Sequence, residues 1–367
     1  MTCLFDLSFI RYNIYAGVSK YAYRILDYIV EVNKTSEFVL LLNSISEKQI
    51  REWYPQFKYI IISSGCVKRF PIIRTLILSF KFKQIANHCN CDIVFCPWGN
   101  EISCLTINKT KISVIHDLQL RLDLKGLNIW IHKQIYDRVI KNSDKIVTIS
   151  EFSKKQILSF YPNVANDFVV SLGNCVSVRE YKGERLLKDD YILYVGRICK
   201  MKNIITLIRA FGLIHHDLSN IKLVIVGKKN DYWYRKLLPI LEKYNCVDKA
   251  IVIENCSEND LTSWYRYAKL FVFPSLREGF GSPPLEAAIA MCPVLSSTCD
   301  SLEEVLMNKV YTYSDPCNEQ ELAKRISSVL QCEIPFESLK QIKDFYLSQY
   351  SIEVVGKRIY SYLQANC

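Results

Sequence analysis

Residues 191–203 read YILYVGRICKMKN, and this stretch decides the fold of the half of the chain that it opens. Its apolar start predicts a buried strand, and Gly196 and Arg197 follow that strand directly. Lys202 and Asn203 come shortly afterwards, just before a periodic apolar segment that predicts a helix. A strand that turns into a helix in this way is the repeating unit of a parallel sheet covered by helices.

The same alternation of apolar runs and amphipathic segments extends in both directions from this stretch. Spacing of about 20 to 30 residues from one run to the next is what parallel strands with crossover helices need. The predicted strands are Leu4–Leu7, Phe38–Leu42, Tyr59–Ile62, Ile93–Cys96, Ile112–Ile115, Ile146–Ile149, Phe168–Ser171, Tyr191–Val195, Lys222–Val226, Ile251–Ile253, Leu270–Phe273 and Val294–Ser296. The predicted helices are Val18–Val32, Pro71–Asn87, Asn128–Lys141, Glu151–Phe160, Ile204–Ile214, Tyr232–Tyr244, Asn259–Ala268 and Pro284–Met291.

The chain has 367 residues, more than one typical domain of about 150, so we expect two domains. Residues 1–178 are the predicted N-terminal domain and residues 191–344 the predicted C-terminal domain. Residues 179–190 are charged and aperiodic, which predicts a linker, and residues 345–367 predict a helical tail. The fold class is therefore α/β, with two tandem Rossmann-like domains facing across a cleft. Open parallel sheets bind ligands past the carboxyl ends of their strands, so residues at those ends are the first candidates for a site.

Composition narrows the classes of partner. The formal net charge of +10 suits nucleic acid, an anionic membrane surface or an anionic substrate. No nucleic-acid-binding module is recognisable, so charge alone predicts weak, salt-sensitive binding and no specific nucleic-acid partner. The first residues lack the pattern of a secretion signal, and no apolar run has the length of a membrane span. The 15 cysteines are odd in number and scattered, which predicts reduced thiols in a cytoplasmic protein.

Residues 273–286 read FPSLREGFGSPPLE and hold the densest group of candidate site residues. Glu278 lies in the loop after a predicted strand, and Glu286 lies in the first turn of a helix that two prolines open. Gly279 and Gly281 permit close approach of the backbone to a ligand. Two carboxylates in this arrangement could grip the hydroxyls of a polyol. A glycine-rich turn followed by a helix-capping glutamate is the alternative interpretation.

Charged and polar residues follow two other predicted strands. Arg197 and Lys202 lie in a strand-to-helix turn, which supplies the fixed positive charge and backbone donors that a diphosphate needs. Taken alone, both could equally be solvated loop charges. His116 ends a strand of the first half. A lone histidine there is more often structural, but Asp117 beside it at the mouth of the sheet favours a role in a site.

Several segments together resemble family 4 glycosyltransferases of the GT-B fold, in particular their mannosyltransferase-like group 1. The Glu-x7-Glu motif of that family corresponds to Glu278 and Glu286. The other similar segments are the glycine loop at 16–21, the strand-ending His-Asp at 114–118, the strand and helix start at 147–153 and the phosphate-binding turn at 192–203. The resemblance extends across almost the whole chain, and in the family a final helix, here 352–363, crosses back onto the first domain.

The resemblance implies a retaining glycosyltransferase that uses a nucleoside-diphosphate sugar. Arg197 and Lys202 would neutralise the leaving diphosphate. Glu278 would meet the donor sugar, Glu286 would hold the ribose hydroxyls, and His116 would lie on the sugar side of the cleft. The remaining donor-binding residues would be Gly17, Gly196, Gly279, Phe280, Gly281 and Leu285. No metal and no other cofactor is implied, because the family relies on cations and helix ends.

The partners that the resemblance implies are a nucleotide-sugar donor and a glycan or lipid-linked glycan acceptor. GDP-mannose is the first expectation for the donor, because the glycine loop ends in Val-Ser-Lys-Tyr as in the mannosyltransferase-like group. A UDP-sugar is the alternative. By analogy the setting would be bacterial surface-polysaccharide synthesis, such as that of an O-antigen. A nucleotide-sugar epimerase and a non-catalytic nucleotide-sugar sensor are the alternative functions, although a sensor has no need of cations that act only in a transition state.

The chain departs from the family pattern outside the donor motifs. Ser19 and Lys20 stand where glycine and arginine are frequent. Met291 stands where a glycine usually separates the helix from the next strand, and Glu303 replaces a usual proline. A glycine expected after Val305 is absent. We expect these changes to alter the helix-to-strand connections rather than the activity.

Residues 68–83 mix basic with large apolar side chains. If helical, this stretch would be basic and apolar enough to lie on an anionic bilayer. A cytoplasmic protein would then be peripheral on the inner face of the cytoplasmic membrane. The alternative is a buried helix of the first domain with basic ends.

Overall fold

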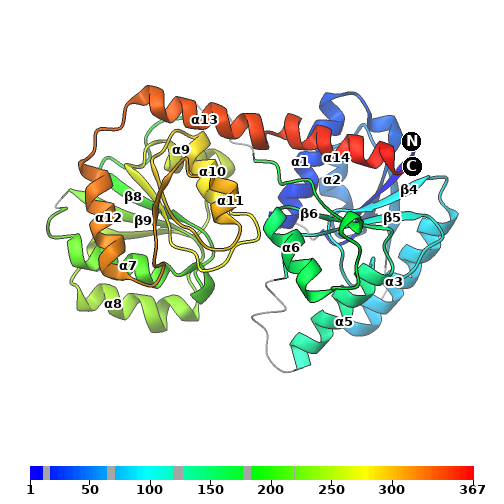
Figure 1. Cartoon of the computed structure of the whole chain (residues 1–367), viewed down its shortest axis with the longest axis horizontal. Coiled ribbons are helices and arrows are strands. Elements are labelled where there is room, and N and C mark those ends of the chain that lie inside the picture. Colours follow the sequence, from blue (N-terminus) through cyan, green and yellow to red (C-terminus); the bar gives the residue numbers. More distant parts are fainter. Residues whose placement is uncertain (11–16, 64–70, 119–126, 177–182, 219) are drawn as a thin grey trace. The chain divides into compact units, whose positions relative to one another are not determined.

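The computed structural model describes residues 1–10, 17–63, 71–118, 127–176, 183–218 and 220–367. The chain divides into two compact units. Unit 1 comprises Met1–Cys175 and Tyr350–Cys367, and unit 2 comprises Val176–Gln349. Each unit is an open parallel sheet covered by helices (Figure 1). This confirms the predicted α/β class with two tandem Rossmann-like domains.

The sheet of unit 1 has seven strands in the order β3-β2-β1-β4-β5-β6-β7, and all of its neighbouring strands are parallel. The strands are β1 (Cys3–Leu7), β2 (Phe38–Asn43), β3 (Lys58–Ile62), β4 (Ile93–Cys96), β5 (Thr110–Ile115), β6 (Lys145–Thr148) and β7 (Val169–Ser171). β1 and β4 are buried along their whole length, as strands covered on both faces are. The order reverses between β1 and β4, so their carboxyl ends form the switch point of this sheet.

The helices of unit 1 cover both faces of this sheet. They are α1 (Gly17–Glu31), α2 (Glu47–Trp53), α3 (Pro71–His88), α5 (Leu127–Lys141), α6 (Glu151–Phe160) and α14 (Ile352–Ala365), with short 3-10 turns at Thr35–Glu37 and Asn166–Phe168. Ser150 begins α6 by accepting a hydrogen bond from the amide of Ser153, because a hydroxyl at this position satisfies an N–H that has no partner within the helix. Helix α3 buries Leu78 and Phe82 against Leu4 and Val94 of the sheet.

The last helix of the chain, α14, packs on α1 in unit 1 (Figure 1). Gly356 lies directly on Tyr28 of α1, where a Cβ atom would collide with the tyrosine ring. The Tyr360 hydroxyl donates a hydrogen bond of 2.8 Å to the Glu37 carboxylate. Residues more than 300 positions apart are thereby joined, so the C-terminal helix is part of the core of unit 1.

The sheet of unit 2 has six strands in the order β10-β9-β8-β11-β12-β13, again parallel throughout. The strands are β8 (Asp190–Val195), β9 (Ile221–Val226), β10 (Ala250–Ile253), β11 (Leu270–Phe273), β12 (Val294–Ser297) and β13 (Tyr311–Tyr313). Here the order reverses between β8 and β11. The carboxyl ends of these two strands therefore form the switch point of unit 2.

The helices of unit 2 alternate with these strands. They are α7 (Ile204–Ile214), α8 (Leu238–Lys243), α9 (Glu258–Arg266), α10 (Ser282–Ile289), α11 (Leu302–Leu306), α12 (Glu319–Gln331) and α13 (Phe336–Tyr350), with short helical turns at Lys200–Lys202, Trp233–Leu237 and Val247–Lys249. Helices α7 and α12 share one core cluster with the strands, in which Leu207, Phe211 and Ile326 are buried.

The unit boundaries differ from the predicted domain limits of 178 and 345. Unit 2 already begins at Val176, and the return to unit 1 begins at Tyr350. Residues 345–349 stay with unit 2 because α13 continues through them. Its Tyr346 is fully buried and its hydroxyl donates a 2.7 Å hydrogen bond to the carbonyl of Leu306. Residues 179–182 of the predicted linker lie outside the described residues.

The segment predicted as one helix, Tyr232–Tyr244, is a π-helical turn over Trp233–Leu237 followed by α8. Pro239 at the start of α8 explains the change, since proline has no N–H to donate to the preceding turn. Helix α2 and strand β13 were not predicted, nor were α11 and α12.

Two methionines hold backbone conformations that favour glycine. Met291 follows α10 with a φ of 62°, and Met307 follows α11 with a φ of 48°. These are the places where the family pattern has glycine. The connections therefore keep a left-handed residue at both positions, although a side chain disfavours that conformation.

The fourteen cysteines within the described residues are all free thiols. None of the helices that these residues form is long and apolar enough to cross a membrane.

Candidate active site

The switch point of unit 2 brings together the two loops that carry most of the predicted site residues. The turn 196–203 follows β8, and the loop 274–281 follows the neighbouring strand β11. The amide of Leu276 donates a 2.9 Å hydrogen bond to the carbonyl of Met201, which joins the two loops directly. A crevice at this place is where doubly wound sheets bind nucleotides.

The first half of the β8–α7 turn is held close to the next strand. The amide of Gly196 donates to the carbonyl of Val226, at 3.0 Å, and Gly227 lies so close to Gly196 that a Cβ atom there would collide with the Gly196 carbonyl. The Tyr194 hydroxyl donates to the carbonyl of Arg197, at 3.0 Å. Arg197 itself is exposed, and no hydrogen bond or ion pair engages its guanidinium within the described part of the chain. Its charge is therefore available to a ligand.

The second half of the turn is organised by Asn203. This residue is buried and left-handed, with a φ of 51°. Its side-chain amide donates to the carbonyls of Pro274, at 3.1 Å, and Pro316, at 2.5 Å. Its side-chain oxygen accepts from the Thr206 hydroxyl, at 2.9 Å, in the first turn of α7. Asn203 thus fixes the turn that presents Lys202.

Lys202 and Glu278 form a buried ion pair between the two loops. The Lys202 ammonium lies 2.5 Å from Oε1 of Glu278, and the two side chains are only 13% and 8% exposed. The ammonium also lies 5.8 Å from the ring centroid of Phe273. The structure therefore brings together two of the predicted catalytic residues, 76 positions apart in the sequence.

The backbone of the Glu278 loop is held from its other side by the end of β12 and its connection to α11, residues 296–301. Asp300 accepts a hydrogen bond from the amide of Glu278, at 3.2 Å, and the Ser301 hydroxyl donates to the carbonyl of Glu278, at 3.0 Å. Ser297 and Cys299 both donate to the carbonyl of Ser275, at 2.6 and 2.9 Å. These residues were not predicted as part of the site. Their only local signal is a run of six small polar residues at the end of a predicted strand.

Helix α10 positions Glu286. Gly281 precedes the helix with a φ of 88°, where a Cβ atom would collide with Leu302, so only glycine fits. Glu286 is buried, and its carboxylate accepts a 3.2 Å hydrogen bond from the Tyr265 hydroxyl. Burial, together with the charge of Glu286, raises the pKa of Tyr265 well above its ordinary value, so this hydroxyl keeps its proton.

Two of the predicted donor-binding side chains are buried beside these carboxylates. Phe280 is 4% exposed and Leu285 is fully buried in the first turn of α10. Their side chains support the loop rather than present a surface. A role in donor binding would therefore have to come from their backbone groups, as it would for Gly279.

His116 lies at the carboxyl end of β5 in unit 1. Its Nε2 makes a 2.9 Å hydrogen bond with the carbonyl oxygen of Pro97, so this nitrogen carries the proton and Nδ1 is the acceptor. Tyr21 of α1 packs edge-on against the imidazole, with ring centroids 5.0 Å apart. Burial lowers the pKa of His116 to about 4, so the ring is neutral at physiological pH. Its predicted place on the sugar side of a donor stays a prediction.

Gly17 is the first residue of α1, and a Cβ atom added there would meet nothing within 4 Å. No packing within the described residues of unit 1 therefore requires a glycine at this position. Residues 11–16 of the glycine loop lie outside the described residues.

The arrangement in unit 2 suits a ligand with one strongly anionic part and one hydroxyl-rich part. Arg197 and Lys202 supply positive charge, and Glu278 and Glu286 supply carboxylate oxygens that accept hydrogen bonds from hydroxyls. Among the residues that the structure describes, no group of three or more histidine, cysteine, aspartate or glutamate side chains is arranged to hold a metal ion.

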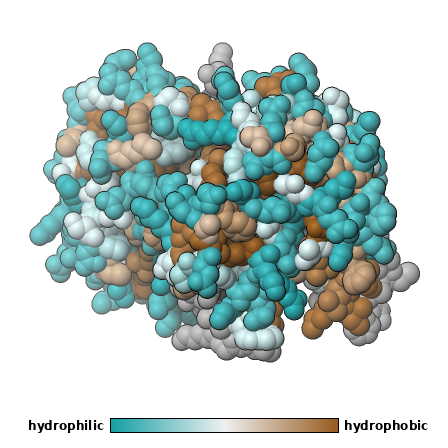
Figure 2. Space-filling model, turned by 45° about the vertical axis from the view of Figure 1, so that its right-hand side comes forward, coloured by the Kyte–Doolittle hydropathy of each residue, from teal (hydrophilic) through white to brown (hydrophobic). Residues whose placement is uncertain are grey.

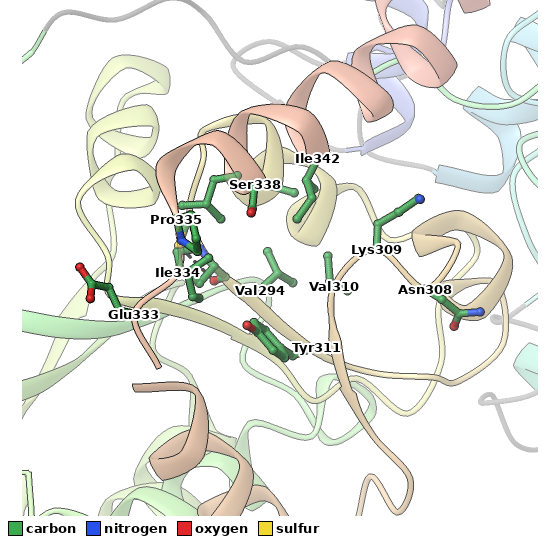
Figure 3. Close-up of a pocket in the computed structure, with 14 residues that line it drawn as sticks. Val294, Asn308, Lys309, Val310, Tyr311, Glu333, Ile334, Pro335, Ser338 and Ile342 are labelled. Carbon is green, nitrogen blue, oxygen red and sulfur yellow. Dashed lines mark hydrogen bonds between the residues drawn. The ribbon is translucent and has the colours of Figure 1, made fainter. Parts of the chain in front are cut away.

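A separate cavity of about 360 Å³ lies at the opposite, amino-terminal edge of this sheet (Figure 3). Val294 of β12, Tyr311 of β13 and Val310 just before β13 line it, and Ser338 and Ile342 of α13 face them. None of the predicted site residues lines this cavity. The switch-point loops and this cavity are therefore two different features of unit 2.

Comparison with known proteins finds a family that the second unit resembles. Residues 179–345 match the family described as "Glycosyl transferases group 1". The chain is 29% identical over 214 residues to the serotype-specific mannosyltransferase WbdA of Escherichia coli, a match that covers 54% of this chain and 26% of the relative. It is 30% identical over 192 residues to the O-antigen chain mannosyltransferase RfbU of Salmonella typhimurium, with 52% of each chain covered. The chain thus spans only a quarter to a half of these relatives.

The fold of the whole chain also matches solved structures. HepE of Anabaena, solved with UDP and glucose, aligns over 100% of both chains with a TM-score of 0.79 and 12% identity. Sucrose-phosphate synthase of Thermosynechococcus elongatus aligns over the same share of both chains with a TM-score of 0.79 and 15% identity. The expected resemblance to glycosyltransferases of the GT-B fold is thereby confirmed: residues 179–345 match the group 1 family, and the chain has the fold of these solved structures.

Proposed function

We propose that the chain transfers a hexose from a nucleoside-diphosphate sugar to a glycan or lipid-linked glycan acceptor, with retention of configuration. The observation that carries this proposal is the switch point of unit 2, where Lys202 and Glu278 lie on adjoining loops and Glu286 lies in helix α10, all within the segment that matches the group 1 glycosyltransferases. The mannosyltransferases among the relatives favour a mannosyl donor, and therefore GDP-mannose, in surface-polysaccharide synthesis.

In this proposal the bond between the anomeric carbon and the diphosphate breaks, and its electrons stay on the phosphate oxygen. Arg197 and Lys202 stabilise the negative charge that grows there, which is worth most where water is scarce. The acceptor hydroxyl oxygen bonds to the anomeric carbon, and its proton passes to the leaving diphosphate. Glu278 accepts hydrogen bonds from the sugar hydroxyls and Glu286 from the ribose. No metal is invoked in these steps.

Calorimetric titration with GDP, UDP and dTDP tests the donor site. We expect one of the three nucleotides to bind. The substitution Glu286→Gln should weaken its binding, because the ribose hydroxyls lose a charged hydrogen-bond acceptor. Binding of UDP instead of GDP would favour a UDP-sugar, and a second structure of HepE contains UDP-glucose. If none of the three nucleotides binds, the proposal is wrong. If a nucleotide binds, product analysis separates a transferase from an epimerase, and the presence of turnover separates both enzymes from a sensor.

We further propose that α3 of unit 1 rests on an anionic membrane surface. Figure 2 shows hydrophobic side chains reaching the surface in patches among hydrophilic ones. Ile72, Leu76 and Phe80 recur at every fourth position of α3 and are 78%, 62% and 66% exposed. This stripe is continuous along one face of the helix because residues four apart lie above one another. Lys68, Arg69 and Phe70 lie outside the described residues.

The charge and the core-facing side of α3 both fit this proposal. Arg74, Lys81 and Lys83 provide basic side chains along the same helix, while Leu78 and Phe82 anchor its opposite face in the core. Sedimentation with neutral vesicles and with vesicles containing an acidic lipid tests it. We expect more protein to sediment with the acidic vesicles than with the neutral ones. The double variant with Leu76→Ser and Phe80→Ser should abolish this difference. Leu186→Ser, at an exposed site in unit 2, is the control. Equal sedimentation with both vesicles would refute membrane binding.

A further inference from the structure

The ion pair between Lys202 and Glu278 has a consequence for what the donor site accepts. The two charges are 2.5 Å apart and nearly buried, so each compensates part of the charge of the other. A buried pair loses far more when one partner is taken away than the pair contributes while intact, because a charge is then left uncompensated. A ligand that binds Lys202 therefore weakens the pair, unless the ligand also offers hydrogen-bond donors to the Glu278 carboxylate.

The two kinds of nucleotide differ in this respect. A free nucleoside diphosphate offers phosphate oxygens to Lys202 and nothing to Glu278. A nucleotide-sugar offers the same phosphates to Lys202 and, in addition, sugar hydroxyls to Glu278. We propose that the Lys202–Glu278 pair makes the site select a nucleotide-sugar over the free nucleoside diphosphate, which is the product of the transfer. This inference rests on the proposed function.

The backbone of Glu278 is fixed at the switch point. Asp300 and Ser301 hold the amide and carbonyl of Glu278, at 3.2 and 3.0 Å. Ser301 is fully buried and Glu278 is 6% exposed. The carboxylate is thus buried beside the ammonium of Lys202. When a free diphosphate draws on Lys202, the carboxylate loses part of the charge that compensates it, and it repels the phosphates.

Lys202 is equally confined. Asn203, the next residue, is tied to Pro274 and Pro316 across the sheet edge. The ammonium lies 5.8 Å from the ring centroid of Phe273 and 2.5 Å from Glu278, and the side chain is only 13% exposed. A diphosphate therefore has to meet Lys202 beside Glu278, where the carboxylate competes with it for the same ammonium.

This inference is tested by whether one substitution raises or lowers the affinity for the nucleoside diphosphate. Glu278→Gln keeps the shape of the side chain but removes the competing charge. We expect the variant to bind the nucleoside diphosphate about tenfold more tightly, a change of about 1.4 kcal/mol. Binding of the nucleotide-sugar should not tighten to the same extent, because the variant also loses a charged acceptor for the sugar hydroxyls. The preference for nucleotide-sugar over nucleoside diphosphate therefore falls.

A double-mutant cycle assigns the effect to Lys202. Calorimetry measures the dissociation constants of the nucleoside diphosphate and its nucleotide-sugar for the unaltered chain, Glu278→Gln, Lys202→Met and the double variant. The nucleotide used is whichever of GDP, UDP and dTDP the unaltered chain binds. We expect Glu278→Gln to tighten nucleoside diphosphate binding only where Lys202 is present. The double variant lacks both charges of the pair. It therefore also shows whether a single variant fails to bind only because it is misfolded.

The outcomes separate this inference from the proposed function. Suppose that Glu286→Gln weakens binding of the nucleoside diphosphate, but Glu278→Gln leaves this binding unchanged or weakens it. The donor site is then supported, and selection by the ion pair is wrong. If Glu278→Gln tightens binding equally with and without Lys202, the pair is not the cause and the inference also fails. If the unaltered chain binds none of the three nucleotides, the proposed function fails and the inference fails with it.

Discussion

The side-chain amide of Asn203 lies 3.1 Å from the carbonyl oxygen of Pro274, 71 positions later in the chain. This hydrogen bond ties the turn after β8 to the end of β11, the two strands of the switch point in unit 2. The same amide reaches Pro316 at 2.5 Å, so one buried side chain holds three segments together. The ion pair of Lys202 with Glu278 depends on this framework.

Asn203→Ala should therefore be strongly destabilising. The carbonyls of Pro274 and Pro316 each lose the hydrogen bond from the Asn203 side chain. Alanine is also placed in a left-handed conformation that asparagine tolerates better. We expect unit 2 to lose about 3 kcal/mol of unfolding free energy, measured by urea denaturation. Asn203→Gly is the matched control, because it removes the same hydrogen bonds without backbone strain and should cost less. Equal losses in both variants would show that the backbone conformation is not strained.

Arg197→Ala should lower activity without lowering stability. The guanidinium is exposed and makes no ion pair with any described residue, so its loss should change the unfolding free energy by less than about 0.5 kcal/mol. If it stabilises the leaving diphosphate, turnover should fall about 100- to 1,000-fold. Arg235→Ala, which removes an exposed arginine elsewhere in unit 2, is the control and should retain full activity. Near-normal turnover of Arg197→Ala would remove this residue from the mechanism.

Met291→Gly should stabilise the chain. Met291 has a φ of 62°, a conformation that costs a side-chain-bearing residue about 1 kcal/mol and glycine almost nothing. We expect a gain of about 1 kcal/mol, seen as a higher Tm in thermal unfolding. Met291→Ala keeps the backbone strain and should give no such gain. A loss of stability in the glycine variant would mean that packing of the methionine side chain outweighs the strain.

Asp6 in unit 1 predicts a specific pH dependence of stability. Its carboxyl is fully buried, and one of its oxygens has no hydrogen-bond partner among the residues that the structure describes. Burial raises its pKa from 3.8 to about 6, so this group favours the folded state below about pH 4 and loses that contribution as the pH rises through 6. At about 1.4 kcal/mol per pKa unit, the contribution is about 3 kcal/mol.

The measurement compares the unaltered chain with Asp6→Asn, which cannot titrate. Unfolding free energies are determined by urea denaturation at pH 4, 5, 6 and 7. We expect the unaltered chain to gain up to about 3 kcal/mol relative to the variant as the pH falls from 7 to 4. Using the difference between the two proteins cancels the titration of every other group. A difference that does not change with pH would mean that Asp6 has an ordinary pKa.

Much of the architecture was predictable because local patterns determine it. Strands β4 and β11 and helices α6 and α7 have the predicted bounds, since apolar runs bounded by polar or glycine residues leave little choice of register. Segments without such a pattern were missed. Helix α11 has only five residues and α12 follows a three-residue strand, so neither offers a long periodic signal.

The residues of the switch point were predictable one by one, but their relationships were not. The sequence by itself determined that Lys202 and Glu278 follow strands of one parallel sheet, because strand and helix periodicity is local. Only the tertiary structure decided that β8 and β11 are neighbours, that the two side chains form a buried ion pair, and that Asp300 and Ser301 hold the backbone of Glu278. The physical reason is that strand order and side-chain burial depend on contacts between distant segments.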